Sequence, residues 1–227
     1  GNNIFSGCTS LASVTILGEY IGNYAFSGCS SLKNVYIQEV KNIGEHAFYG
    51  CTDAEITIPE SIESIGNYAF YDCAGIAEIT IPESVKSIGN YAFSGCTGIT
   101  EITIPESVEN TGNYVFSGCE NIKNVNIQEG VKKIAAGTFA GCDGLVEITI
   151  PESVKSIGNY AFSYCENLEN VNIQEGVTSI GDKVFDHCLG IRELIIPKSI
   201  TSIGINVFSD CIYNHRTTKT NQKYPSV

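Results

Sequence analysis

The chain has 227 residues and a formal net charge of −12 at pH 7, which disfavours nucleic acid as a partner because phosphates repel an acidic surface. Hydrophobic residues make up 43% and charged residues 17%, a composition typical of a packed core and not of a disordered chain. The apolar runs are only a few residues long, so no membrane span is expected in this sequence. The sequence contains no Met, and we interpret it as a piece of a larger product.

One repeat runs from residue 1 to about residue 211. The chain has ten Phe and ten Cys, and every Cys follows a Phe by three residues. Successive Phe are 21 to 23 residues apart, and the segment ITIPESVKSIGNYAFS occurs word for word at 79–94 and again at 148–163. A period of this length predicts a solenoid in which each copy forms one coil and equivalent residues stack in columns.

The repeat predicts the same elements in each copy, in the same order. Residues 1–5 align with the middle of a copy, so the chain is expected to begin inside a coil. A short strand is predicted at 101–104 and its equivalents, because apolar and polar residues alternate there, and the Pro that follows ends it. A nearly invariant Gly comes next, with Ala135 as the exception, and predicts either a positive φ or a close approach between coils. Only a single helical turn fits around Ala92–Phe93, so few and short helices are expected.

The Phe and Cys columns are predicted to form the core. Stacked at a strand spacing of roughly 4.7–4.9 Å, the Phe rings would make a continuous aromatic column. An even number of Cys admits disulfides, but stacked Cys side chains point the same way, so free buried thiols are favoured. The structural residues singled out in these two columns are Phe93, Phe116, Phe139, Cys96, Cys119 and Cys142.

The outward side of the predicted strands is the candidate ligand-contact face, and it is polar and acidic. Two residues break its regularity, Tyr36 and Ile195, and they are the better contact candidates. The alternative is that these are solvated positions copied by duplication. A further acidic row follows the strands from Glu39 to Glu175, and stacked like charges are expected to repel. The candidate face comprises Tyr36, Glu55, Thr57, Glu78, Thr80, Glu101, Thr103, Asn124, Asn126, Glu147, Thr149, Asn170, Asn172, Glu193 and Ile195.

A column of Tyr precedes the Phe column. Such Tyr residues could serve as a binding platform, but a structural role is favoured, in which they cap the core edge and form hydrogen bonds in the turn. The column consists of Tyr24, Tyr68, Tyr91, Tyr114 and Tyr160, interrupted by His46, Gly137, Lys183 and Asn206.

The sequence contains no recognisable catalytic or metal motif. His46, His187 and His215 lie far apart in repeat register, and none has a partnered nucleophile. G-x-S-x-G, H-E-x-x-H, P-loop and G-x-G-x-x-G patterns are absent, as are the Cys pairs of zinc sites and the glycine-aspartate repeats of calcium-binding β-rolls. We therefore predict no enzyme activity, no catalytic residue, no metal and no cofactor.

The motif IPxSVxSIGxxAFxxCxxL resembles the BspA-like leucine-rich-repeat family, and the resemblance covers residues 1 to about 211. It implies a mainly β solenoid, a horseshoe of about ten coils of 21–23 residues with short strands. It also implies a non-enzymatic interaction module at the cell surface or outside the cell, adhering to host or neighbouring-cell proteins. A protein partner is expected and a glycan is a second candidate. The alternative is a structural spacer with no ligand of its own.

The last sixteen residues, 212–227, leave the repeat and carry basic residues but no acidic ones. Two interpretations stand side by side: a tail that folds back over the last coil, and a linker to whatever follows. The sequence shows no secretory signal, so an extracellular location rests on the family resemblance alone.

Overall fold

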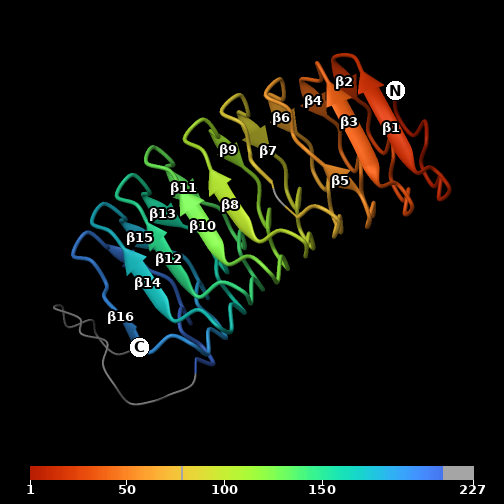
Figure 1. Cartoon of the computed structure of the whole chain (residues 1–227). Helices are drawn as coiled ribbons and strands as arrows, with labels where there is room; N and C mark the ends of the chain where they lie inside the picture. Colours follow the sequence, from red (N-terminus) through yellow and green to blue (C-terminus); the bar gives the residue numbers. More distant parts are fainter. Residues whose placement is uncertain (78, 212–227) are drawn as a thin grey trace.

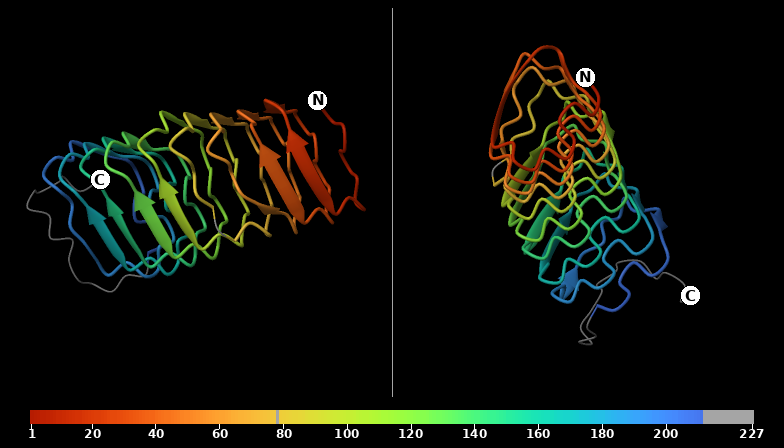
Figure 2. Two further views of the ribbon diagram at one scale, coloured as in Figure 1. Left: turned by 45° about the horizontal axis from the view of Figure 1, so that its top comes forward. Right: turned by 90° about the vertical axis from the view of Figure 1, so that its right-hand side faces the viewer.

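The structure is a computed structural model that describes residues 1–77 and 79–211. The expectations for Glu78, His215 and the tail at 212–227 therefore lie outside the described residues. The chain winds into an elongated β-solenoid, and its coils follow one another from the N-terminus onward (Figure 1). Seen along the axis, successive coils overlie one another (Figure 2). The predicted mainly β solenoid is confirmed.

Most coils contribute one strand to a front ladder and a second, usually shorter strand to a rear ladder (Figure 1). The front ladder comprises β1 Ser13–Leu17, β3 Asn34–Gln38, β5 Glu55–Ile56, β8 Glu101–Ile104, β10 Asn124–Ile127, β12 Glu147–Ile150, β14 Asn170–Ile173 and β16 Glu193–Leu194. The rear ladder comprises β2 Tyr20–Ile21, β4 Asn42–Ile43, β6 Ser64–Ile65, β7 Ser87–Ile88, β9 Asn110–Thr111, β11 Lys133–Ile134, β13 Ser156–Ile157, β15 Ser179–Ile180 and β17 Ser202–Ile203. The front strands occur where the alternating pattern predicts them; the rear strands were not predicted.

All paired strands are parallel and pair in the register of the repeat. Ser13 pairs with Asn34, and Asn34 with Glu55, while Glu147 pairs with Asn170, and Asn170 with Glu193. The front ladder divides into the sheets β1-β3-β5, β8-β10 and β12-β14-β16, and the rear ladder into β2-β4-β6-β7-β9 and β11-β13-β15-β17. The described residues form eight front strands, fewer than the ten coils predicted. Phe5, the first of the ten Phe, precedes β1, so the Phe column leaves nine intervals in which a front strand can lie. No front strand forms among the described residues of the interval that contains 79–81.

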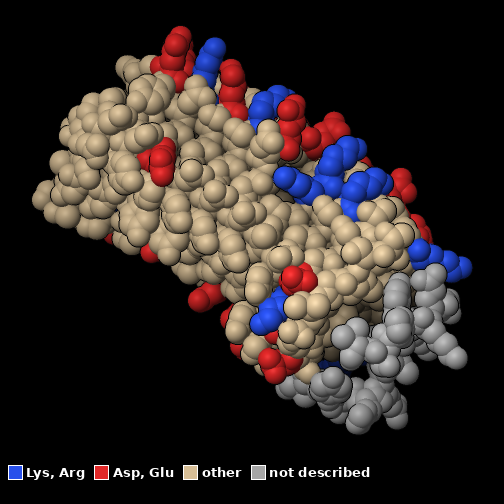
Figure 3. Space-filling model, turned by 180° about the vertical axis from the view of Figure 1, so that it is seen from behind, with Lys and Arg blue, Asp and Glu red and all other residues tan. Residues whose placement is uncertain are grey.

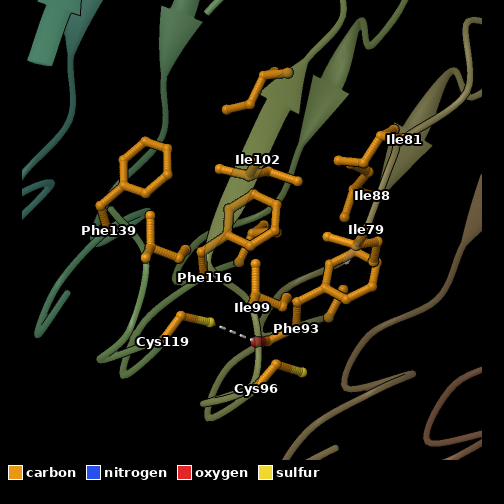
Figure 4. Close-up of a cluster of buried hydrophobic side chains, with 14 of the residues drawn as sticks. Ile79, Ile81, Ile88, Phe93, Cys96, Ile99, Ile102, Phe116, Cys119 and Phe139 are labelled. Carbon is orange, nitrogen blue, oxygen red and sulfur yellow. Dashed lines mark hydrogen bonds between the residues drawn. The ribbon is translucent and has the colours of Figure 1, made fainter. Parts of the chain in front are cut away.

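The Phe column forms the predicted aromatic core. Neighbouring rings from Phe5 to Phe208 stack with centroids 5.0–5.8 Å apart and planes within 14° of parallel. Phe93, Phe116 and Phe139 are fully buried, with Ile99 and Ile102 packed in the same cluster (Figure 4). Burial of each ring gives roughly 1.5–3 kcal/mol of gross stabilisation, so this column is a main source of stability.

The ten Cys are free thiols, as predicted, and all are buried except the exposed Cys8 and the half-buried Cys211. The Sγ atom of Cys119 donates to the carbonyl oxygen of Phe93 in the preceding coil at 3.1 Å (Figure 4). The same carbonyl accepts the backbone N–H of Cys96 at 3.2 Å. Cys thus fills a small apolar position and supplies a weak donor to the second lone pair of a buried carbonyl.

The repeated Gly is required by a close approach between coils, and not by a positive φ. A Cβ atom on Gly66 would lie 2.7 Å from the backbone nitrogen of Glu45 and 2.7 Å from the carbonyl carbon of Gly44. The positive φ occurs instead two residues further on, as at Tyr68 (φ 54°) and Tyr91 (φ 55°). This left-handed residue interrupts any right-handed helix, so the expected helical turn near Ala92–Phe93 is a hydrogen-bonded turn.

The part of the chain that the structure describes contains no helix long and apolar enough to cross a membrane.

Candidate functional site

The outward side chains of the front ladder surround a shallow groove of about 1020 Å³ over β8, β10, β12, β14 and β16. Period-two alternation creates it, because Ile102 and Ile148 turn into the core while their strand neighbours face solvent. We call this surface the front groove. Its polar and exposed lining comprises Thr80, Thr100, Glu101, Thr103, Lys123, Asn124, Asn126, Glu147, Thr149, Asn170, Asn172, Glu193 and Ile195.

Most of the predicted contact face lies in the front groove, but its first members do not. Tyr36, Glu55 and Thr57 are exposed on the earlier coils, outside the groove lining. The Glu55 carboxylate lies 3.9 Å from the Lys33 ammonium. Tyr36 lies on β3 and Ile195 directly follows β16, so the two residues that break the pattern belong to opposite ends of the ladder and do not form one contact patch.

Charge in the front groove is negative but not a continuous acidic stripe. Along one column Glu alternates with Asn, in the order Glu101, Asn124, Glu147, Asn170 and Glu193. The Asn124 amide donates to the Glu101 carboxylate at 2.8 Å. Repulsion between carboxylates is relieved in this column of the groove, because an amide that can donate separates each pair of Glu residues.

Sequence reasoning missed two groove residues, Thr100 and Lys123. Both directly precede a front strand, so the sequence pattern places them in the connection before the strand and not on the strand itself. Their position one coil apart was visible in the repeat, so stacking could have grouped them. Among the groove-lining residues that the structure describes, Lys123 is the one basic side chain, against three Glu.

The rear face differs from the front groove. Charged side chains of both signs gather along one long edge, and much of the face between the edges carries no charge (Figure 3). Ion pairs of the described residues include Lys41 with Glu63 at 3.9 Å, and both side chains are more than half exposed. Such exposed pairs contribute little stability.

The Tyr column stacks as a second aromatic series. Ring centroids from Tyr24 through His46, Tyr68, Tyr91 and Tyr114 are 4.5–5.0 Å apart. No side-chain hydrogen bond of these five rings is found among the described residues, so the hydrogen-bonding part of the prediction is not seen. These five residues themselves have the left-handed backbone conformation in the turn, and their structural contribution is the stacking of their rings.

One His has titratable neighbours that the sequence interpretation did not anticipate. The Nδ1 atom of His187 lies 3.2 Å from a carboxylate oxygen of Asp186, and its Nε2 atom lies 3.8 Å from Asp210 in the next coil. These groups therefore form a cluster. The described residues place no hydroxyl or thiol nucleophile in a hydrogen-bonded pair with a His side chain.

The comparisons with known proteins agree with this geometry. The model of the BspA type leucine rich repeat region matches residues 1–121 and 86–215, with six copies. The chain belongs to this family. Among curated proteins, none matches it. Repeat solenoids of this family are typically non-enzymatic.

Solved structures with the same fold are bacterial leucine-rich repeat proteins. A leucine rich cell surface protein from Faecalibacterium prausnitzii is 26% identical with a TM-score of 0.55 over 90% of this chain. A T. pallidum leucine rich repeat protein is 25% identical with a TM-score of 0.55, covering 88% of this chain and 77% of its own. A Eubacterium ventriosum leucine-rich repeat protein is 22% identical with a TM-score of 0.73, over 94% of this chain. The chain spans 62% of the length of the first and the last of these proteins.

Proposed function

We propose that this chain is a non-enzymatic protein-interaction module of a cell-surface or secreted protein, and that the front groove contacts the partner. The observation that carries the proposal is the groove itself, a hollow of about 1020 Å³ lined by exposed polar side chains held on rigid parallel strands. Extended surfaces of this kind are what repeat proteins use for binding. The surface location is supported by the F. prausnitzii relative, whose description names it a cell surface protein.

The groove favours a partner with basic and hydrogen-bonding groups. Glu101, Glu147 and Glu193 give it negative charge, while the Asn and Thr side chains offer donors and acceptors to a peptide or to sugar hydroxyls. Ile195, which is 67% exposed at one end, offers an apolar contact. We propose adhesion to a protein on a host or neighbouring cell, with a glycan as the second class of ligand.

The test is a binding screen of this chain against extracellular-matrix proteins, serum proteins and intact cells. Any specific ligand is then titrated at rising salt, and its affinity is expected to fall because the groove contact is partly electrostatic. A ligand whose affinity does not change with salt would contradict the acidic-groove contact.

A structural spacer is the second candidate, and one observation favours it. The word-for-word copies at 79–94 and 148–163 show that coils three repeats apart carry few individual features. A spacer predicts no saturable binding in any part of the screen, and that result would replace the interaction module with the spacer.

A further inference from the structure

Outside the front groove, the strongest candidate for a ligand site is the cluster formed by Asp186, His187 and Asp210. They lie on two successive coils near the C-terminal end of the described residues. One ligand atom from each residue can be chosen so that all three atoms lie within 4.8 Å of one another. Most other copies carry Ser at the position of Asp186, as in Ser94 and Ser163, and Gly at the position shared by His187 and Asp210.

The buried carboxylate of Asp186 is the second, independent observation. Asp186 is only 3% exposed, and its Oδ1 atom has no hydrogen-bond partner. The Nδ1 atom of His187 is buried and also lacks a partner, because its 3.2 Å approach to Asp186 is not aligned as a hydrogen bond. An unsatisfied buried carboxylate oxygen is costly and calls for a compensating group.

Lys183 compensates only part of this charge. Its ammonium lies 3.8 Å from Oδ2 of Asp186, the other oxygen, and its side chain is 36% exposed. It also lies 5.9 Å above the ring of Tyr160. Among the described residues the ammonium pairs with Oδ2 of Asp186 alone, so negative charge is left uncompensated on the side of Oδ1.

We propose that Asp186, His187 and Asp210 bind a divalent transition-metal cation of the zinc type. One imidazole nitrogen with two carboxylate oxygens suits Zn²⁺, whereas Ca²⁺ and Mg²⁺ prefer oxygen ligands alone. Zinc bond lengths of about 2.0–2.2 Å put tetrahedral ligand atoms roughly 3.4 Å apart, so ligand atoms that lie within 4.8 Å of one another require a contraction of at most about 1.4 Å. Asp210, with a side chain 70% exposed, is free to make it.

The imidazole is already held in place. The ring of Tyr164, from the preceding coil, stacks on His187 with centroids 4.4 Å apart and planes 15° from parallel. Asp186 and Asp210 come from successive coils, so a bound cation would join these coils by coordination. The site would therefore stabilise this end of the solenoid, where Ile203 and Ile205 are exposed.

The experiment is a calorimetric titration of the chelator-treated full chain with zinc chloride alone, together with a thermal melt. Cys8 and Cys211 are changed to Ser in all samples, because accessible thiols also bind zinc. We expect a single zinc ion per chain, a higher melting temperature that EDTA reverses, and no comparable effect of Ca²⁺ or Mg²⁺. Absence of zinc binding would overturn the proposal.

Two variants test the location of the site, and each introduces a residue that other copies carry at the same repeat position. Asp186→Ser and His187→Gly should each weaken zinc binding by about tenfold or more, while both fold without zinc. His187→Gly also removes a non-Gly residue with φ 58°. The matched control is His46→Tyr, which replaces the other described His by the residue of its column and should leave zinc binding unchanged. Wild-type affinity in His187→Gly would refute the assignment.

Discussion

At the scale of single residues, the repeated Gly and the repeated Cys determine how closely the coils pack. The absent Cβ of the repeated Gly lets the backbone of one coil lie against the next, as at Gly66. The Cys thiol fills the space beside the Phe column and donates to a buried carbonyl of the previous coil, as Cys119 does to Phe93. Both positions tolerate little added volume because protein cores are close-packed.

The Gly66→Ala variant should be destabilised by about 2 kcal/mol, because its Cβ would lie 2.7 Å from backbone atoms of the preceding coil. Chemical denaturation measures the change in the free energy of unfolding. The matched control is Ala135→Gly, at the equivalent position that already carries a Cβ, which should cost only about 0.5–1 kcal/mol. Equal effects of the two changes would contradict the close approach.

The buried thiols predict loss of stability at alkaline pH. Burial raises the pKa of Cys51, Cys119 and Cys165 from 9.0 to about 12. In the unfolded chain these thiols ionise near pH 9, so the stability they contribute is complete below that pH and is lost as the pH rises toward 12.

Unfolding free energy should therefore be flat between pH 7 and 8 and fall steeply above pH 9. Above about pH 10, Cys119→Ala should fall less steeply than the wild type, by about 1.4 kcal/mol per pH unit, since it lacks one titrating thiol. Parallel pH profiles for the two proteins would show that Cys119 ionises normally in the folded state.

At the scale of elements, the stacked Phe column and the paired strands act together. Phe116 is 1% exposed and stacks between Phe93 and Phe139 with centroids 5.5 and 5.8 Å away. Its ring therefore contacts three coils at once, whereas the hydroxyl of the neighbouring Ser117 contributes no side-chain hydrogen bond among the described residues.

Phe116→Ala should cost about 3–5 kcal/mol and lower the melting temperature by about 10 °C, because it opens a cavity in the aromatic column. Ser117→Ala is the matched control and should shift the melt by no more than about 2 °C. Circular dichroism during heating measures both, and equal shifts would argue against the column as a main source of stability.

The sequence predicts most of this fold because the repeat period fixes the register. Glu147, Asn170 and Glu193 are 23 residues apart, and they pair as that spacing requires. The rear strands escaped prediction because two residues, such as Ser87–Ile88, are too short for a periodic signal. The contact between His187 and Asp210 was available in principle, since these residues also lie 23 apart at one repeat position.

At the scale of the whole molecule, the front groove distinguishes one region of a repetitive surface. It covers β8 to β16 and leaves out Tyr36 and Glu55 on the earlier coils, a boundary that could not be read from the repeat because the repeat gives every coil the same pattern. Whether the groove residues bind a partner stays a prediction. The rear face, with little charge away from its edge, is the natural comparison surface (Figure 3).

The most direct measurement is the dissociation constant of a partner for two variants that each add one positive charge. Thr149→Arg places the charge inside the front groove, and Asn113→Arg places it on an exposed residue between β9 and the Phe column. We expect Thr149→Arg to weaken binding by about tenfold or more, and Asn113→Arg to leave it within about twofold, because only the first variant blocks the groove and reduces its negative charge. Equal dissociation constants for both variants and the wild type would contradict the front groove as the interaction surface.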